Sequence, residues 1–170
     1  EFTNQEMNQI YNHPKVKAMV CLTKGEGFGR PLLEFSLVNK PIITTNWSGH
    51  IDFLNPEYTT LLPGQLTNVH QHTSNNMLLK DSQWFSVDTG QVGAYLKHVF
   101  ENYKSYKEKA KRQGYQNRTN FSFNQMKEKI DNILQNKIPE FPKHVSLKLP
   151  KLKKIQKSSP SLPKLKKVEA

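Results

Sequence analysis

Residues 16–45 read VKAMVCLTKGEGFGRPLLEFSLVNKPIITT and contain the stretch that decides the fold. Val16 to Thr23 and Pro41 to Thr45 are apolar or β-branched runs of strand length, and Pro31 to Val38 between them has the composition of a short helix. Pro31 suits the first helical position, where its missing N–H costs nothing. Strands without a clean polar alternation are typical of a parallel sheet covered on both faces. The stretch therefore predicts a strand, a crossover helix and a parallel strand.

The rest of the chain adds weaker signals. A third short strand is expected at Tyr58 to Leu62, and the polar segment from Gln65 to Gly90 is expected to be irregular. One helix should begin near Asp88 or Thr89 and end at Gly114, and another should follow a Ser122–Gln125 capping box and end at Ile138. The first of these helices repeats apolar residues at helical spacing and is expected to bury all six of them: Val92, Tyr95, Leu96, Val99, Phe100 and Tyr103.

The net charge of +11 is concentrated at one end of the chain. Residues 137–170 contain ten lysines, two glutamates and the repeated motif LPKLKK, whereas residues 1–136 carry a net charge of only +3. This pattern predicts a partial Rossmann-like domain over residues 1–138 and an extended, disordered Pro/Lys-rich tail over residues 139–170. The tail is interpreted as a solvated basic segment or as a contact for an anionic membrane surface. Nucleic acid is disfavoured as a partner, because aromatic residues for base stacking are absent from the last 29 positions.

The single cysteine, Cys21, excludes an internal disulfide and favours a reducing compartment. The sequence has no 18-residue apolar stretch and no recognisable signal peptide. A cytoplasmic protein, with a possible peripheral membrane association through the tail, is therefore expected. Because the sequence starts at Glu1 rather than methionine, a fragment or a processed product is also expected.

The glycine-rich loop GEGFG, residues 25–29, leaves the carboxyl end of the first strand and enters the predicted helix. Ligands of open parallel sheets bind at this end, where backbone N–H groups favour anions or sugar oxygens. A dinucleotide fingerprint is excluded, because Arg30 stands where its third glycine belongs. A P-loop is excluded as well, because no Gly-Lys-Ser/Thr follows.

Two glutamates remain to be explained, Glu26 in the loop and Glu34 in the helix, with seven residues between them. Glu34 has an ordinary structural interpretation, because an acid near a helix N-terminus is stabilised by the helix dipole. Glu26 has no such interpretation. An acid between two glycines contributes little to secondary structure and suits a hydrogen-bond acceptor for ligand hydroxyls.

These motifs, KGEGFGRPLLE, then NKPIITTNWSGHIDFL and LLPG, resemble the carboxyl-terminal half of the retaining group 1 (family 4) glycosyltransferases, which have the GT-B fold. The resemblance covers roughly residues 13–135. It implies an α/β fold with a partial Rossmann-like parallel sheet and flanking helices.

The resemblance also implies roles for individual residues. Glu26, taken as the catalytic residue, would accept hydrogen bonds from the donor sugar, and Glu34 would accept one from the nucleotide ribose. The remaining donor-binding residues would be Gly27, Phe28, Gly29, Arg30, Ser48 and Gly49. Ser48 and Gly49 replace the glycine pair usual in the family, and Asp52 stands where glutamate is common. His50 is either a phosphate contact or an ordinary loop histidine, and the second interpretation is favoured.

The implied activity is transfer of a sugar from a nucleotide diphosphate sugar to an unidentified glycan, lipid or protein acceptor, with retention of configuration. Neither a cofactor nor a metal is expected, and His70 and His72 are not interpreted as ligands. The 170 residues alone are expected not to catalyse transfer. The alternative is a non-enzymatic nucleotide-sugar-binding or scaffold module that attaches to a surface through the basic tail.

Overall fold

The computed structural model describes residues 2–73, 78–79 and 81–139, and its centre is a three-stranded parallel sheet. Strands β1 (Met19–Cys21), β2 (Ile42–Thr45) and β3 (Thr60–Leu62) lie in this order, with Met19 beside Ile42 and Ile43 beside Thr60. The three predicted parallel strands are confirmed. All are shorter than their apolar runs, and β1 lies at an edge of the sheet.

Helix α2 (Arg30–Ser36) is the predicted crossover between β1 and β2. Its N-cap is Gly29, whose φ of 84° is readily adopted only by glycine. Pro31 is the second rather than the first helical residue, a position where its missing N–H is equally harmless. The helix therefore starts directly from the glycine loop.

The central strand β2 is covered on both faces, as the unbroken apolar runs predicted, whereas Val20 of the edge strand β1 is 47% exposed. On one face Ile42 packs with Leu32 and Phe35 of α2, against helix α1 (Asn4–Asn12). On the other face Ile43 packs with Leu62 and with helix α3 (Thr89–Glu101). Successive residues of β2 thus anchor two separate apolar clusters, because side chains alternate along a strand.

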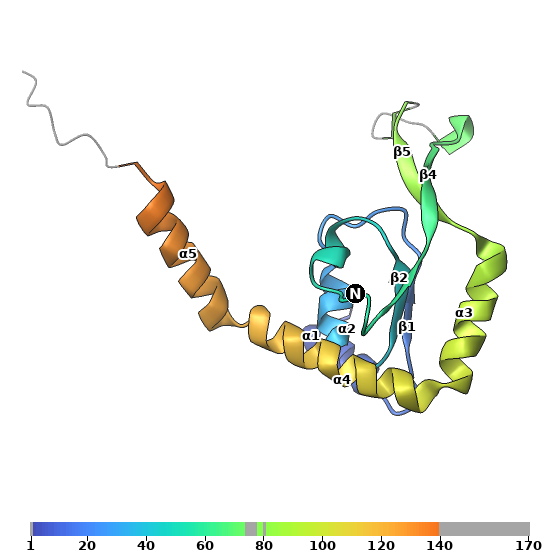
Figure 1. The fold of residues 1–170 in the computed structure, drawn as a ribbon, viewed down its shortest axis with the longest axis horizontal. Helices are drawn as coiled ribbons and strands as arrows, with labels where there is room; N and C mark the ends of the chain where they lie inside the picture. The colour runs from blue at the N-terminus through green and yellow to red at the C-terminus, as the bar shows by residue number, and fades with distance from the viewer. Residues whose placement is uncertain (1, 74–77, 80, 140–170) are drawn as a thin grey trace, which may run out of the picture.

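The expectation of an irregular segment from Gln65 to Gly90 is wrong. Strands β4 (Gly64–Asn68) and β5 (Gln83–Val87) form an antiparallel hairpin that projects from the parallel sheet (Figure 1). The short 3₁₀ helices η1 (Gly49–Asp52) and η2 (Gln71–Thr73) complete the connections in this half of the chain.

The single helix predicted to end at Gly114 is two helices. Helix α3 ends at Glu101, and α4 (Tyr103–Asn120) starts after Asn102. Of the six predicted core residues only Val99 is buried, and Phe100 is 81% exposed. Asp88 is confirmed as the N-cap of α3, since its side chain accepts a hydrogen bond from Gly90 N–H.

Helix α4 is fastened to the domain by buried amides. The Gln113 side chain donates to the carbonyl of Phe53 at 2.7 Å and accepts from the N–H of Asn55 at 2.7 Å. It also donates to Asn117, which in turn donates to Ser36 of α2. Because both side-chain amides are buried, this network stabilises only one placement of α4.

Helix α5 (Phe123–Lys137) follows and points away from the rest of the domain (Figure 1). The predicted Ser122 cap is confirmed, although Gln125 bonds Glu128 instead of closing the capping box. The predicted end at Ile138 is also confirmed. Nearly all of the predicted disordered tail, from residue 140 onward, lies outside the described residues.

Replacing Gly114 tests the docking of α4. Gly114→Ala should lower the free energy of unfolding by about 1–3 kcal/mol, because the new Cβ would lie 2.7 Å from the carbonyl oxygen of Ser36 and would overlap Asn39. Gly93→Ala in α3 is the matched control, because its Cβ would meet open space. That change should stabilise the protein by about 0.5–1 kcal/mol through helix propensity. Urea unfolding of both variants measures the two changes in the free energy of unfolding. Equal changes would contradict the close contact of Gly114 with Ser36 and Asn39.

Candidate functional site

The loop of residues 24–29 connects β1 to α2 and lies at the carboxyl end of the parallel sheet. Glu26 is half-buried in it, and only the main chain of Glu26 is bonded among the described residues. Its carboxylate therefore has free acceptor capacity beside a backbone that ligands can approach. Gly27 leaves this approach open, because a Cβ added there would meet no atom within 4 Å.

The loop is locked to the turn that follows β2. The Ser48 hydroxyl accepts a hydrogen bond from Glu26 N–H at 3.0 Å and donates one to the Glu26 carbonyl at 2.5 Å. Gly49 N–H donates to the same carbonyl at 2.9 Å. Three hydrogen bonds thus join the two predicted halves of the site.

The residues of this second turn fit their positions for physical reasons. Ser48 has a φ of 82°, a conformation that favours glycine, and its two hydrogen bonds to Glu26 offset part of that strain. Gly49 has no room for a side chain, because an added Cβ would overlap the backbone of Gly27 and lie 2.9 Å from the Cα of Phe28. Of the two positions, Gly49 is the one that requires glycine for close contact.

His50 is fully buried beneath the loop and does not face solvent. Its Nε2 lies 2.6 Å from the carbonyl oxygen of Thr45, so this nitrogen carries the proton and donates. The Nδ1 atom is buried and has no hydrogen-bond partner among the described residues. The contact with Thr45 supports the structural interpretation of His50.

Phe28 covers one side of the loop. Its ring centroid lies 5.1 Å from that of Phe53 and 6.1 Å from that of Phe121, at the end of α4. The Phe28 side chain is nevertheless 44% exposed. It therefore offers an apolar surface beside Glu26 while fixing the loop to α4.

Arg30 and Glu34 lie on α2 and form a hydrogen-bonded ion pair at 2.8 Å. Both side chains line a groove of about 740 Å³ between α1 and α2, together with Tyr11. Burial raises the pKa of Tyr11, and the negative charge of Glu34 raises it further, while Arg30 lowers it. Glu34 therefore belongs to the α1 groove, whereas Ser48 and Gly49 lie directly against the Glu26 loop.

The hairpin supplies site residues that sequence reasoning missed. Phe85 N–H donates to the carbonyl of Lys24, so β5 is bonded to the start of the glycine loop. The Lys24 ammonium lies 5.2 Å from the ring centroid of Trp84, and Trp47 stacks on Phe85 at 5.9 Å. The aromatic and β-branched residues of the sequence WFSV, 84–87, were the available signal for this strand.

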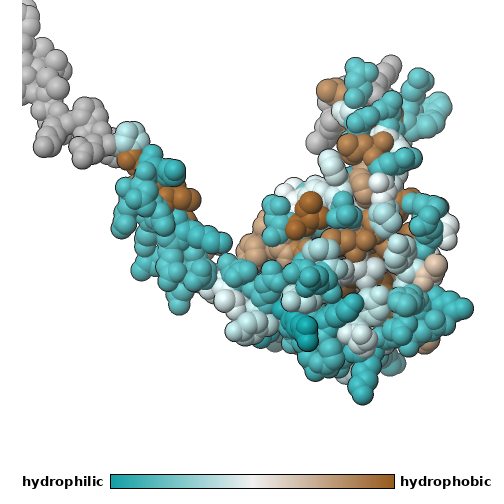
Figure 2. All heavy atoms as spheres, in the orientation of Figure 1, coloured by the Kyte–Doolittle hydropathy of each residue, from teal (hydrophilic) through white to brown (hydrophobic). Residues whose placement is uncertain are grey.

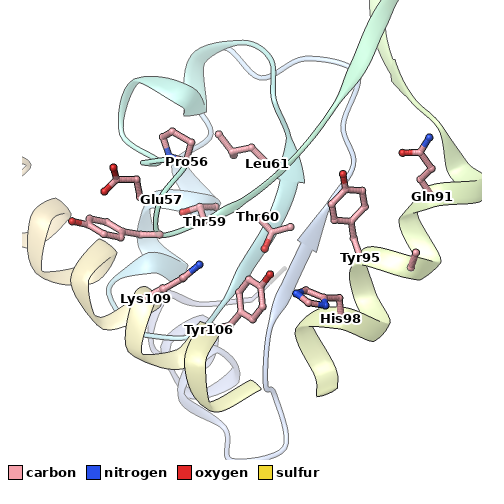
Figure 3. A pocket seen from close by; sticks show the side chains of 12 residues that line it. Pro56, Glu57, Thr59, Thr60, Leu61, Gln91, Tyr95, His98, Tyr106 and Lys109 are labelled. Atoms are coloured by element: carbon pink, nitrogen blue, oxygen red, sulfur yellow. The ribbon is translucent and has the colours of Figure 1, made fainter. Parts of the chain in front are cut away.

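A second cavity, of about 700 Å³, lies along the free edge of β3 (Figure 3). Tyr95 and His98 of α3 and Tyr106 of α4 surround it with aromatic rings. The buried hydroxyl of Thr60 has no hydrogen-bond partner among the described residues. None of the predicted site residues line this cavity.

We searched the described residues for a metal site and compared the chain with known proteins. In the part of the chain that the structure describes, no three His, Cys, Asp or Glu side chains are grouped to hold a metal ion. His72 of η2 stacks on His70, the residue that precedes this short helix. No protein-family model, curated protein or solved structure matches the chain.

The lock between the two turns can be tested with two glycines. Gly49→Ala should lower the free energy of unfolding by about 1–3 kcal/mol, because the Glu26 loop must move to admit the methyl group. Gly27→Ala should have little effect, since its Cβ would meet open space and Gly27 has no positive φ. Thermal unfolding of the two variants measures the difference. A stable Gly49→Ala protein would show that the turns are not in close contact.

Proposed function

We propose that this chain forms the donor-binding part of a retaining glycosyltransferase, which transfers a sugar from a nucleotide diphosphate sugar. The observation that carries this proposal is the hydrogen-bonded lock between the Glu26 loop and the Ser48–Gly49 turn. It holds a half-buried carboxylate, which has no side-chain partner among the described residues, at the carboxyl end of two parallel strands.

The chemistry of these groups suits a sugar and its diphosphate. A carboxylate is a strong acceptor for two neighbouring hydroxyls, and the open backbone around Gly27 allows a bulky polar ligand to approach. Lys24 and Arg30 flank the loop in the sequence and are proposed to supply positive charge for a departing diphosphate, which requires that Lys24 leaves the Trp84 ring and that Arg30 leaves Glu34. Glu34 is proposed to accept a hydrogen bond from the ribose, which requires that its ion pair with Arg30 rearranges. An exposed pair of this kind costs little to rearrange.

Glu34→Ala tests the ribose contact. The variant should bind nucleotide diphosphates about tenfold more weakly or worse, because a hydrogen bond to a charged acceptor contributes about 1.5–3 kcal/mol. Titration calorimetry with UDP, GDP and ADP and with their glucose conjugates measures the affinity. Glu101→Ala is the control, since Glu101 is an exposed acid of α3 whose carboxylate forms an ion pair with Lys97. Unchanged affinity of Glu34→Ala would contradict the ribose assignment.

Gly27→Ala tests the approach to the loop separately from stability. Because the methyl group would occupy the open space above the loop, donor affinity should fall while the unfolding transition stays in place. The same calorimetric titrations measure this change. If the unmodified chain bound none of these nucleotides or sugars, a scaffold role would replace the transferase proposal.

A further inference from the structure

Helix α5 carries an apolar face that no described residue covers. Figure 2 shows this face as a hydrophobic stripe on an otherwise polar helix, and none of the side chains of α5 is buried. Ile130 and Ile133 are 48% and 56% exposed. The stripe, called here the α5 face, consists of Phe123, Met126, Ile130, Ile133 and Leu134.

Two lysines of α5 flank this face, one on each side. At about 100° per residue, the α5 face spans about 100° of the helix circumference. Lys127 and Lys129 fall just outside its two borders, Asp131 lies beyond Lys127, and Glu128 falls on the opposite side. Lys137, the last residue of α5, falls within the angular range of the face. Lysines at the borders can extend their ammonium groups outward while their methylene chains remain beside apolar surface.

The sequence after the helix continues the positive charge. Residues 140–170 contain nine lysines and two glutamates. Polybasic segments are attracted to anionic lipid surfaces by about 1 kcal/mol for each lysine near the surface. The positive charge at the borders of the α5 face and in the following sequence is thus complementary to a negatively charged bilayer.

We propose that α5 binds the surface of an anionic lipid bilayer, with the α5 face inserted at the boundary between headgroups and acyl chains. Helices that lie in this boundary have an apolar face, a polar opposite face and basic residues at its borders, and α5 has each of these features. No helix among the described residues has the length and the apolar content to cross a bilayer. This proposal concerns a different surface from the nucleotide-sugar site and does not depend on it.

The position of α5 in the fold allows this contact. The helix leaves the domain after Phe121, and its whole length projects beyond α4 (Figure 1). A helix of this length extends over about 22 Å, at about 1.5 Å per residue. It can therefore lie along a membrane while the domain remains in water.

Vesicle flotation of the whole chain tests the proposal with a charge-matched pair of variants. The unmodified protein should float with vesicles of equal parts phosphatidylcholine and phosphatidylglycerol, and should float less with phosphatidylcholine alone. Ile130→Glu should lower the partition coefficient at least about tenfold, because it removes a large apolar side chain from the inserted face. Gln135→Glu adds the same charge on the polar side of α5 and should retain most of the binding. Both variants should fold normally, since neither side chain is buried.

Three results would overturn the proposal. The first is no flotation with the anionic vesicles. The second is equal flotation of Ile130→Glu and Gln135→Glu, which would assign the binding to the lysine-rich sequence alone. The third is a stable dimer in sedimentation that Ile130→Glu dissociates and that does not float, which would mean that a second copy covers the α5 face.

Discussion

The hydrogen bonds between the Glu26 main chain and the Ser48–Gly49 turn are the constraint on which the site depends. Two parallel strands as short as β1 and β2 determine only the approximate positions of the loops that leave them. The lock defines the relative position of these loops more closely, because a single serine hydroxyl satisfies both backbone groups of Glu26. The Glu26 side chain is thus positioned by its own backbone and has no partner in the part of the chain that the structure describes.

The predictions were correct where the local structural preference of the sequence matches the structure that tertiary packing stabilises. The runs around Met19 and Ile42 are apolar on both faces, and both form strands of the parallel sheet. Strand β2 is buried throughout, whereas the edge strand β1 is only partly buried. Asp88 was also informative, because a side-chain N-cap has a strong local preference. The glycine loop was correctly placed between a strand and a helix, although its hydrogen bonds to Ser48 required the structure.

The parts that were missed depend on contacts distant in sequence. Strand β5 is held by its pairing with β4 and by Lys24, neither of which is visible in its own mixed pattern. Gly114 is a helix stop by local rules, yet here it permits close packing of α4 against Ser36 and Asn39. Gln113 and Asn117 have the composition of an exposed helix face, and their burial is explained only by partners 54–81 residues away. Helix α1 is the exception: it was also missed, although Thr3 and Glu6 form a complete capping box that is visible in the local sequence.

The two proposed binding surfaces meet at the end of α4. Phe121, the C-cap of that helix, packs against Phe28 of the glycine loop and against Phe53, and α5 begins two residues later. The buried amides of Gln113 and Asn117 hold the same helix against α2 and the segment after η1. A rotation of α5 about Phe121 would therefore change the orientation of the α5 face without disturbing Glu26, because the contacts that position the loop all precede Ser122. Attachment through α5 would thus leave the geometry of the Glu26 loop unchanged.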